Sequence, residues 1–576
     1  MAFILERILR SSLRVNWLSS SISPSGCDLA IPGVSQQERG FLRSRRRLSS
    51  YESADFLVAR DASGGHSVVL TGHQNPPEDA SVSNSTLAAL PLATPIPADL
   101  LTLGDRLGKH VDDLLQLVAA FRSAPVTPLS AADFERTLLE LTRAIGRDVT
   151  EQTFNHLEHE QPEQAPARIS VAGETYRRRG KYPNTIDTLF GPVRLLRLLY
   201  EPLEAGEVCL HPLEIHLGVV ARSASAALAE RVGLLAAQHA QRPTLSILAE
   251  DHHVHWTHKT LRKVVAEQAA TLAEQRQPEQ VRRLIDWLRQ AFRSKGKYEV
   301  VLAAGRDGIH VPMTHGEYNE ASTATLTVFN RQGKRLGTVY LGRMPQEQQT
   351  TLSEQLTALL SAVLSQWRGA VPRLAYISDA GWHPTDYFTR VLSKMSDARQ
   401  PGKVLVWQRV VDFYHATLYV TKLAEALFGA GARATRWARR MRHVLKEEGG
   451  LTRVLQSASY YRHKRKTPWG PKSVFGKAYR YLHKNRKYMD YARYRRLGLP
   501  IGSGVTEAAC KTLFTQRLKL SGMRWTCQGG QPIVDLRVLH LSGVYQQVCH
   551  AARVARTQCL EGTWAIFSGQ ICRLPG

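Results

Sequence analysis

Two aspartates in this sequence lie where apolar stretches come to an end. The stretch YEVVLAAGRDG predicts a short strand ending at Asp307, and RLAYISDAGWH predicts a second strand ending at Asp379. Mg²⁺ prefers hard oxygen ligands, and two such ions about 3.5–4 Å apart can promote an in-line phosphoryl displacement. Because Asp-Gly is also a common turn dipeptide, Asp307 alone would more often be a loop residue. The pair, in this order, favours a metal site.

The third carboxylate of such a site has two candidates. Asp412 follows a third apolar stretch, and Glu507 lies in the first turn of a helix predicted to begin at a Ser503 cap and to run to about Lys519. That helix could present a metal ligand together with phosphate-binding cations. Glu507 is equally compatible with an ordinary first-turn glutamate that favours the helix dipole and pairs with Lys511. The residues alone leave both interpretations open.

The elements that must position these carboxylates follow an α/β pattern from residue 297 to residue 430. Short apolar strands precede the three aspartates, a hairpin with Gly333 in its turn follows the first strand, and helices separate the others. One of these helices repeats large apolar residues on a single face, namely Leu352, Leu356, Leu359, Val363 and Trp367. The order of strand, hairpin, helix, strand, helix, strand and helix matches a ribonuclease-H-like core, a mixed sheet flanked by helices.

The positive charge is concentrated in one segment. The 576 residues carry a formal net charge of +26, and residues 431–500 hold 20 Lys and Arg against three acids, with seven tyrosines between residues 460 and 494. Cations neutralise phosphates and tyrosine rings can stack on unpaired bases. The segment therefore favours a nucleic-acid contact over a solvated helical surface whose tyrosines pack inward.

Two absences narrow the class of protein. No run of about 18 uncharged apolar residues occurs, so we expect no transmembrane helix and no membrane partner. The seven cysteines are scattered and odd in number, which argues against a secreted disulfide framework and favours a reducing compartment. We therefore expect a protein of the cell interior.

The N-terminal part divides into two regions. Residues 1–100 are basic, Ser-rich and then Pro- and Gly-rich, which predicts a disordered tail and linker, although the opening segment also has the composition of a transit peptide. Residues 101–295 predict a mostly helical region, with Ser130 as a candidate helix cap and a small β-hairpin whose turn contains Pro183 and Asn184. Because no second ligand pair accompanies Cys209 and His211, we expect no zinc there.

The region also contains a candidate DNA-binding motif. The pattern predicts a helix, a break at residues 252–255 and a second helix opening at Thr257, which is the spacing of a helix-turn-helix. Its second helix would present Lys259, Arg262 and Lys263 to DNA. Two ordinary packed helices fit the same pattern equally well.

Several stretches of the chain are specific enough to suggest a family. They are GRDGIHVPM, ISDAGWH, VVDFYHA, DLRVLHLSG and the long KNRKYMDYARYRRLGLPIGSGVTEAACKTLFTQRLKLSGMRW. Together they closely resemble bacterial insertion-sequence transposases of the ISKra class, which belong with the Asp-Asp-Glu transposases of ribonuclease-H-like fold. The resemblance extends over roughly residues 130–545.

The resemblance implies roles for particular residues. Asp307, Asp379 and Glu507 would form the metal-binding catalytic triad and hold two Mg²⁺ ions, for which Mn²⁺ can substitute. Asp412 and His415 fall on an element of related transposases that looks accessory to the site, and His415 is nearly as compatible with a structural role. One departure is Ala380, which follows the second aspartate where glycine is usual.

These expectations define a domain scheme. We expect a disordered segment at 1–100, a helical DNA-binding region at 101–295, the first part of the catalytic core at 296–430 and a basic helical insertion at 431–500. The last part of the core, with the Glu507 helix, would be 501–545, and 546–576 would be a C-terminal tail.

The function expected from the resemblance is that of a DNA transposase of an insertion sequence. It would bind terminal inverted repeats and target DNA as a dimer or higher oligomer, cleave DNA and transfer strands, in the bacterial cytoplasm at the nucleoid. The alternatives are a decayed or domesticated relative that binds DNA without catalysis and a ribonuclease-H-like nuclease. Besides the three helix-turn-helix cations, the expected DNA contacts are Arg462, Lys464, Arg465, Lys466, Lys484, Arg486, Lys487, Arg493, Arg495, Arg496, Lys511, Arg517, Lys519 and Arg524.

Overall fold

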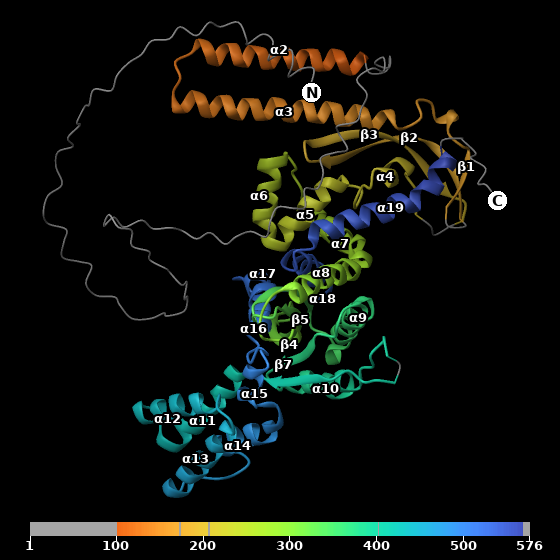
Figure 1. Ribbon diagram of the computed structural model, residues 1–576. Coiled ribbons are helices and arrows are strands. Elements are labelled where there is room, and N and C mark those ends of the chain that lie inside the picture. Colours follow the sequence, from red (N-terminus) through yellow and green to blue (C-terminus); the bar gives the residue numbers. More distant parts are fainter. Residues whose placement is uncertain (1–100, 172–173, 205–207, 401, 568–576) are drawn as a thin grey trace, which may run out of the picture. The chain divides into compact units, whose positions relative to one another are not determined.

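The fold comes from a computed structural model, which describes residues 101–171, 174–204, 208–400 and 402–567 (Figure 1). Every described residue lies in one compact unit, which spans residues 95–576. The tail, linker and transit-peptide predictions for residues 1–100 lie outside the described residues. Among the described helices, none is long and apolar enough to cross a membrane.

Two long helices open the described chain. Helix α2 (Leu101–Ser123) and helix α3 (Pro128–His156) pack against each other, with the rings of Phe121 and Phe134 stacked at 4.5 Å. The N-cap of α3 is Thr127, whose hydroxyl accepts a hydrogen bond from the backbone N–H of Ser130 at 3.1 Å. The prediction of Ser130 as the cap is therefore wrong by one turn, because Ser130 is the reciprocal partner in the capping box.

A small antiparallel sheet follows, with strands β1 (Arg168–Val171), β2 (Glu174–Thr188) and β3 (Gly191–Pro202) in that order. The predicted turn at Pro183 and Asn184 is wrong, since β2 runs through both residues and pairs Pro183 with Leu196. The pairing of β1 with β2 extends only to Arg177, so the part of β2 that contains Pro183 has no strand on that side. Proline is tolerated in this strand because its missing N–H faces an edge where no neighbour requires it.

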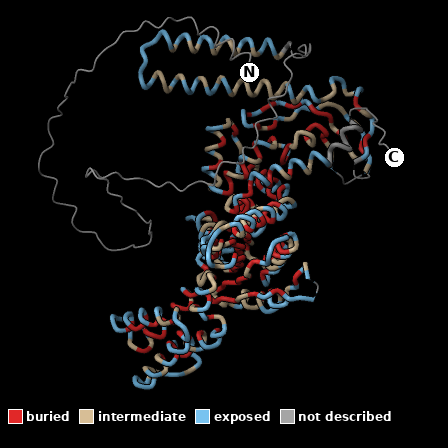
Figure 2. Tube along the Cα trace, viewed as in Figure 1, coloured by how far each residue is buried: buried red, intermediate tan, exposed pale blue. Residues whose placement is uncertain are grey.

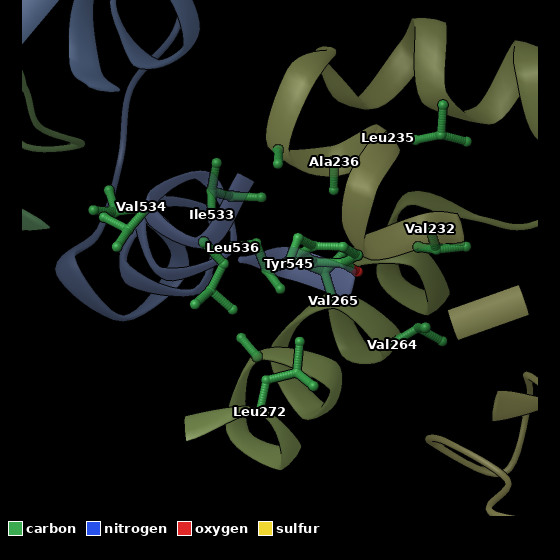
Figure 3. Close-up of a cluster of buried hydrophobic side chains, with 14 of the residues drawn as sticks. Val232, Leu235, Ala236, Val264, Val265, Leu272, Ile533, Val534, Leu536 and Tyr545 are labelled. Carbon is green, nitrogen blue, oxygen red and sulfur yellow. The ribbon is translucent and has the colours of Figure 1, made fainter. Parts of the chain in front are cut away.

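The central helices are α4 (Pro212–His216), α5 (Ala226–Gln238), α6 (Gln241–His252), α7 (His258–Thr271) and α8 (Ala273–Arg293). They share a hydrophobic core with two helices from the other end of the chain, α18 (Cys527–Leu541) and α19 (Tyr545–Phe567). Figure 3 shows part of this core, in which Val232 of α5, Val265 of α7 and Leu536 of α18 belong to one buried cluster. Residues from the predicted regions 101–295 and 501–545 therefore lie in one shared core.

The predicted tail at 546–576 is also different in the structure. Residues up to Phe567 continue helix α19, and Tyr545 at its start donates a hydrogen bond from its hydroxyl to the backbone oxygen of Glu230 at 2.7 Å. Its apolar residues Val548 and Cys549 belong to the core, and this packing is why the segment is helical.

The second sheet has five strands in the order β6-β5-β4-β7-β8. They are β4 (Val301–Pro312), β5 (Tyr318–Phe329), β6 (Arg335–Arg343), β7 (Arg373–Ser378) and β8 (Trp407–Val411). Strands β4, β7 and β8 are parallel, whereas β5 is antiparallel to both β4 and β6. This mixed sheet has the order of elements that the sequence predicts, including the hairpin turn with Gly333 at a φ of 78°.

Helices cover both faces of this sheet, and Figure 2 shows its strands as a largely buried layer. Helix α8 and helix α9 (Thr350–Gln366) pack on the face to which Leu302 and Ala304 point. Helix α11 (Phe413–Phe428) packs on the other face, with Val301 and Ala303. Helix α10 (Trp382–Arg390) and short 3₁₀ turns at Glu347–Gln349 and Leu392–Lys394 complete the connections.

The basic segment is helical, as predicted. It contains α12 (Ala432–Val444), α13 (Gly450–Arg465), α14 (Val474–Lys484), a 3₁₀ turn (Arg486–Tyr488) and α15 (Tyr491–Arg496). Several of its tyrosines point inward and join the core with α11. Tyr491 and Tyr494 are buried and donate hydrogen bonds to the backbone oxygens of Val411 and Arg409, at 2.9 and 3.0 Å. These two rings are therefore not available to stack on bases.

The chain returns to the sheet through α16 (Gly504–Cys510), a π-helical turn (Lys511–Thr515) and α17 (Gln516–Leu518). The sequence predicts one regular helix from Ser503 to Lys519, and this prediction is wrong in the middle. A π turn adds a residue to the turn and changes the direction of the side chains that follow it. A 3₁₀ turn at Pro162–Gln164 completes the described elements.

Candidate active site

Three aspartates lie in one row across the parallel strands. Strand β4 pairs with β7 up to Gly305 and Ile377, and β7 pairs with β8 up to Ser378 and Val411. Continuing both registers places Asp307, Asp379 and Asp412 level with one another on neighbouring chain segments. Neighbouring strands lie about 4.8 Å apart, so the tertiary structure brings together residues that are far apart in the sequence.

The same alternation fixes the face on which these aspartates lie. Val301 and Ala303 of β4 share a core with Ala375 and Ile377 of β7 and with α11. Because side chains two apart on a strand point to the same face, Asp307 lies on that face too. The prediction that β4 ends at Asp307 is wrong, since the strand continues to Pro312 by pairing with β5. Asp379 and Asp412, in contrast, follow directly after their strands.

Helix α16 carries Glu507 to this row. The hydroxyl oxygens of Thr506 and Thr325 lie 2.7 Å apart, which fastens α16 to strand β5. Gly305 on β4 permits this approach, because a Cβ there would lie 2.1 Å from the hydroxyl of Thr506. At the other end of the helix, the thiol of Cys510 lies 3.5 Å from a carboxylate oxygen of Asp307. The sequence contains Gly305, Thr506 and Cys510, but it does not indicate that they form the contact between α16 and the sheet.

Asp412 uses its carboxylate for backbone hydrogen bonds. It is fully buried and caps α11 by accepting a hydrogen bond from the N–H of His415 at 2.6 Å. Its second oxygen accepts a hydrogen bond from the N–H of Ser503, the residue just before α16. The hydroxyl of Ser503 then donates to the carboxylate of Glu507 at 2.9 Å. Asp412 is thus connected to Glu507 through one residue, which favours its accessory assignment over a role as third ligand.

Asp379 sits in a strained turn. Its carboxylate accepts a hydrogen bond from the N–H of Gly381 at 2.8 Å, and its backbone oxygen accepts one from the hydroxyl of Tyr481 at 2.6 Å. Between them, Ala380 has a φ of 65°. This left-handed conformation costs a non-glycine residue about 1–2 kcal/mol, a cost that a glycine at this position would avoid. The two hydrogen bonds hold Asp379 in place despite that strain.

His415 lies in the first turn of α11, beside the same tyrosine. Its ring centroid is 5.8 Å from that of Tyr481 and 5.5 Å from that of Tyr419. The structure therefore places His415 close to the segment that carries Asp379. Its two predicted roles, as an accessory residue and as a structural one, both remain compatible with this position.

The carboxylates of Asp307, Asp379 and Glu507 lie close enough for their charges to affect one another. Burial, the largest cause, raises the pKa of Asp307 from 3.8 to about 6. The charges of Asp379 and Glu507 act in the same direction, and hydrogen bonds from Gly308 and Cys510 oppose it. Within the described part of the chain, no Lys, Arg or His forms an ion pair with any of these carboxylates.

The donors fit a hard divalent ion, but they do not form a complete cage. Among the described residues, no three His, Cys, Asp or Glu side chains are grouped closely enough to hold a metal ion. Mg²⁺ commonly takes only one or two protein carboxylates and keeps several waters. Asp307 and Asp379 are the two carboxylates that would meet that smaller requirement, since the charge of Asp379 is near enough to raise the pKa of Asp307.

The predicted DNA contacts fall into an exposed group and one exception. Lys259, Arg262 and Lys263 are exposed on α7, whose other side packs against α5 and α18. The cations of the basic segment are exposed or half-buried, as are Lys511, Lys519 and Arg524. The prediction that Arg517 contacts DNA is wrong, because Arg517 is 1% exposed and its guanidinium donates a hydrogen bond to the backbone oxygen of Ala236 at 3.0 Å. It joins α17 to α5 and does not face solvent.

Sequence reasoning missed Thr506, Ser503 as a link to Glu507, and Tyr481 as a contact of Asp379. The first two lie within the recognisable stretch GSGVTEAAC, which was the available signal. In comparisons with known proteins, no family model matches the chain, and no curated protein matches it either.

Proposed function

We propose that this protein is a metal-dependent DNA transposase whose catalytic carboxylates are Asp307, Asp379 and Glu507. The observation that supports the proposal is the strand register, whose continuation from the last paired residues puts Asp307 and Asp379 at the same level on neighbouring parallel segments, with the charge of Glu507 close enough to act on Asp307. The strand order and the antiparallel second strand are compatible with a ribonuclease-H-like core. The resemblance of the sequence to insertion-sequence transposases supplies the reaction.

The residues have separable tasks in this proposal. Asp307 and Asp379 would hold Mg²⁺, with Glu507 approaching from α16, and the bound ions would activate the attacking oxygen and stabilise the leaving one. Asp412 orients α16 through Ser503. The hydrogen bonds of Gly381 and Tyr481 keep the Asp379 turn in its left-handed conformation.

The exposed cations would bind the phosphates of DNA. Residues 431–500 carry most of the net positive charge of the chain, and the cations of α7, Lys259, Arg262 and Lys263, add a second surface. Phosphate contacts position DNA without reading its sequence. A reaction that joins two transposon ends would proceed in a dimer or higher oligomer on DNA, in the cytoplasm at the nucleoid.

The proposal is tested with DNA that carries the sequences flanking the coding region. Wild type should cleave and transfer strands in Mg²⁺, whereas Glu507→Gln should bind the same DNA with unchanged affinity and lose both reactions. The matched control is Glu354→Gln, an exposed carboxylate on α9 that should leave activity unchanged.

Other outcomes would identify the rival functions. DNA binding without cleavage by wild type would indicate a decayed relative that only binds DNA. Cleavage without strand transfer would indicate a nuclease. Full activity in Glu507→Gln would remove Glu507 from the catalytic set.

A further inference from the structure

A large cavity lies between the basic segment, helix α11 and the turn and helix that follow β7. Its volume is about 870 Å³, and its walls come from α14, from α11 and from the turn and helix after β7. Helices α11 and α14 pack together along this wall (Figure 1). Ala380, the residue after Asp379, lines the cavity directly. The cavity is therefore adjacent to the proposed catalytic residues but is not formed by them.

The cavity is strongly basic. Four cations contribute to its lining: Lys422 of α11 and Lys477, Arg480 and Lys484 of α14. None of the described residues that line it is acidic. Lys422, Lys477 and Lys484 are exposed, and the ammonium of Lys422 lies 4.7 Å from the centre of the Tyr419 ring. Such a set of cations without carboxylate partners suits phosphate groups.

One wall of the cavity is aromatic. The rings of Tyr419 and Tyr481 both contribute to it and stack on each other at 3.7 Å, with an interplanar angle of 9°. The hydroxyl of Tyr481 donates to the backbone oxygen of Asp379. Thr385 and Asn485 add polar groups to the lining. The stacked pair is thus hydrogen-bonded through Tyr481 to the turn that holds a proposed metal ligand.

We propose that this cavity binds an unpaired nucleotide of the DNA strand next to the phosphate that is cut. Its cations would take the phosphates and its tyrosine wall the base, which is the combination that single-strand sites use. Its volume lies within the range of pockets for small ligands, about 300–1,000 Å³, and so suits nucleotides and not a double helix. The placement next to the scissile phosphate rests on the proposed function, whereas single-strand binding does not.

The test measures binding without catalysis. A fluorescent tetrathymidylate is titrated in EDTA, with fluorescence anisotropy as the readout, against wild type and the double variant Lys422→Gln/Lys477→Gln. The matched control is Lys295→Gln/Lys334→Gln, two exposed lysines at the opposite end of the sheet. We expect the cavity variant to bind at least about tenfold more weakly and the control to change less than about threefold.

A second pair of variants tests the aromatic wall. Tyr419→Ala should weaken tetrathymidylate binding about tenfold, whereas Tyr419→Phe, which keeps the ring, should bind like wild type. Equal affinities for wild type and both lysine variants would overturn the proposal, and so would equal losses in the cavity variant and its control. Binding of thymidine monophosphate as tight as that of tetrathymidylate would assign the cavity to a free nucleotide and overturn the strand assignment.

The outcome is separable from that of the transposase proposal. If wild type transfers strands but the cavity variants bind tetrathymidylate with the affinity of wild type, only the cavity proposal fails. If the cavity binds the single strand but no cleavage occurs on flanking DNA, single-strand binding survives and the transposase proposal fails.

Discussion

The two faces of the central sheet differ in the sign and the surroundings of their buried charged side chains. Arg306 and Asp307 are neighbours on β4, yet their side chains lie on opposite faces. Arg306 is 2% exposed, donates to Ser353 and Gln349 at 2.9 Å each, and lies 4.7 Å from the ring of Tyr387. Asp307 accepts hydrogen bonds from Gly308 and Cys510 but has no ion-pair partner among the described residues.

A similar contrast separates Arg409 on β8 from the carboxylates on the other face of the sheet. Arg409 is buried, donates to Thr385 at 2.7 Å and lies over the rings of Phe388 and Tyr488. On the opposite face, the carboxylates of Asp379 and Glu507 are left without cations. Arg306 and Arg409 are held by hydrogen bonds and aromatic rings, although the Nε of each has no hydrogen-bond partner, whereas the carboxylates lie near one another without an ion-pair partner among the described residues. This contrast separates residues whose loss should change stability from residues whose loss should change activity.

The largest expected effect is on catalysis. Asp307→Asn should reduce cleavage and strand transfer by roughly 10³-fold in Mg²⁺, because an amide is a poor ligand for the ion. The same variant should be more stable than wild type at pH 7 without metal, by about 1–3 kcal/mol, because it removes a buried and uncompensated charge. Chemical denaturation in EDTA measures this difference.

The pH dependence of that difference has a definite sign. The folded pKa of Asp307 is raised from 3.8 to about 6, so the folded protein binds the proton more tightly than the unfolded chain. Its contribution to stability is complete below about pH 4 and is lost as the pH rises through 6. The stability of wild type relative to Asp307→Asn should therefore fall between pH 4 and pH 7. A flat difference across this range would contradict the electrostatic account.

The neighbouring residue should behave in the opposite way. Arg306→Ala should lower the free energy of unfolding by about 2–4 kcal/mol, because it empties a buried site and leaves Gln349 and Ser353 without their donor. In the fraction that remains folded, DNA cleavage per molecule should stay within about threefold of wild type. If Arg306→Ala kept its stability but lost cleavage, the distinction between a face that serves stability and a face that serves catalysis would be wrong.

At Asp412 we expect a smaller loss of cleavage than at Asp307 and a smaller loss of stability than at Arg306. Asp412→Asn keeps one acceptor but turns an amide toward an N–H of His415 or Ser503, which should cost about 1–3 kcal/mol of stability. Cleavage should fall about tenfold through a lower rate at unchanged DNA affinity, and Ser503→Ala should reproduce part of that fall. Asp386→Asn, which breaks a surface pair with Arg390, is the control and should have little effect. A loss as large as that of Glu507→Gln would make Asp412 a metal ligand.

Much of the fold could be predicted from the sequence because its signals are local. Apolar runs gave β4, β7 and β8, the helical repeat through Leu352 and Leu356 gave α9, and turn chemistry gave the hairpin at Gly333. The errors occurred where a partner overrides a local signal. Pro183 lies in a strand because that part of β2 is an edge, and the C-terminal segment is helical because α19 packs into the core with α5.

The sequence by itself determined which charges the chain carries, the order of the strands and helices in its α/β part, and which carboxylates are candidates for metal chemistry. Only the tertiary structure decided that Asp307 and Asp379 are level, that Asp412 is occupied by backbone N–H groups and that Arg517 is buried. The physical reason is that register and burial depend on contacts between distant segments. Periodicity along one segment describes how it folds locally and not which partner it meets.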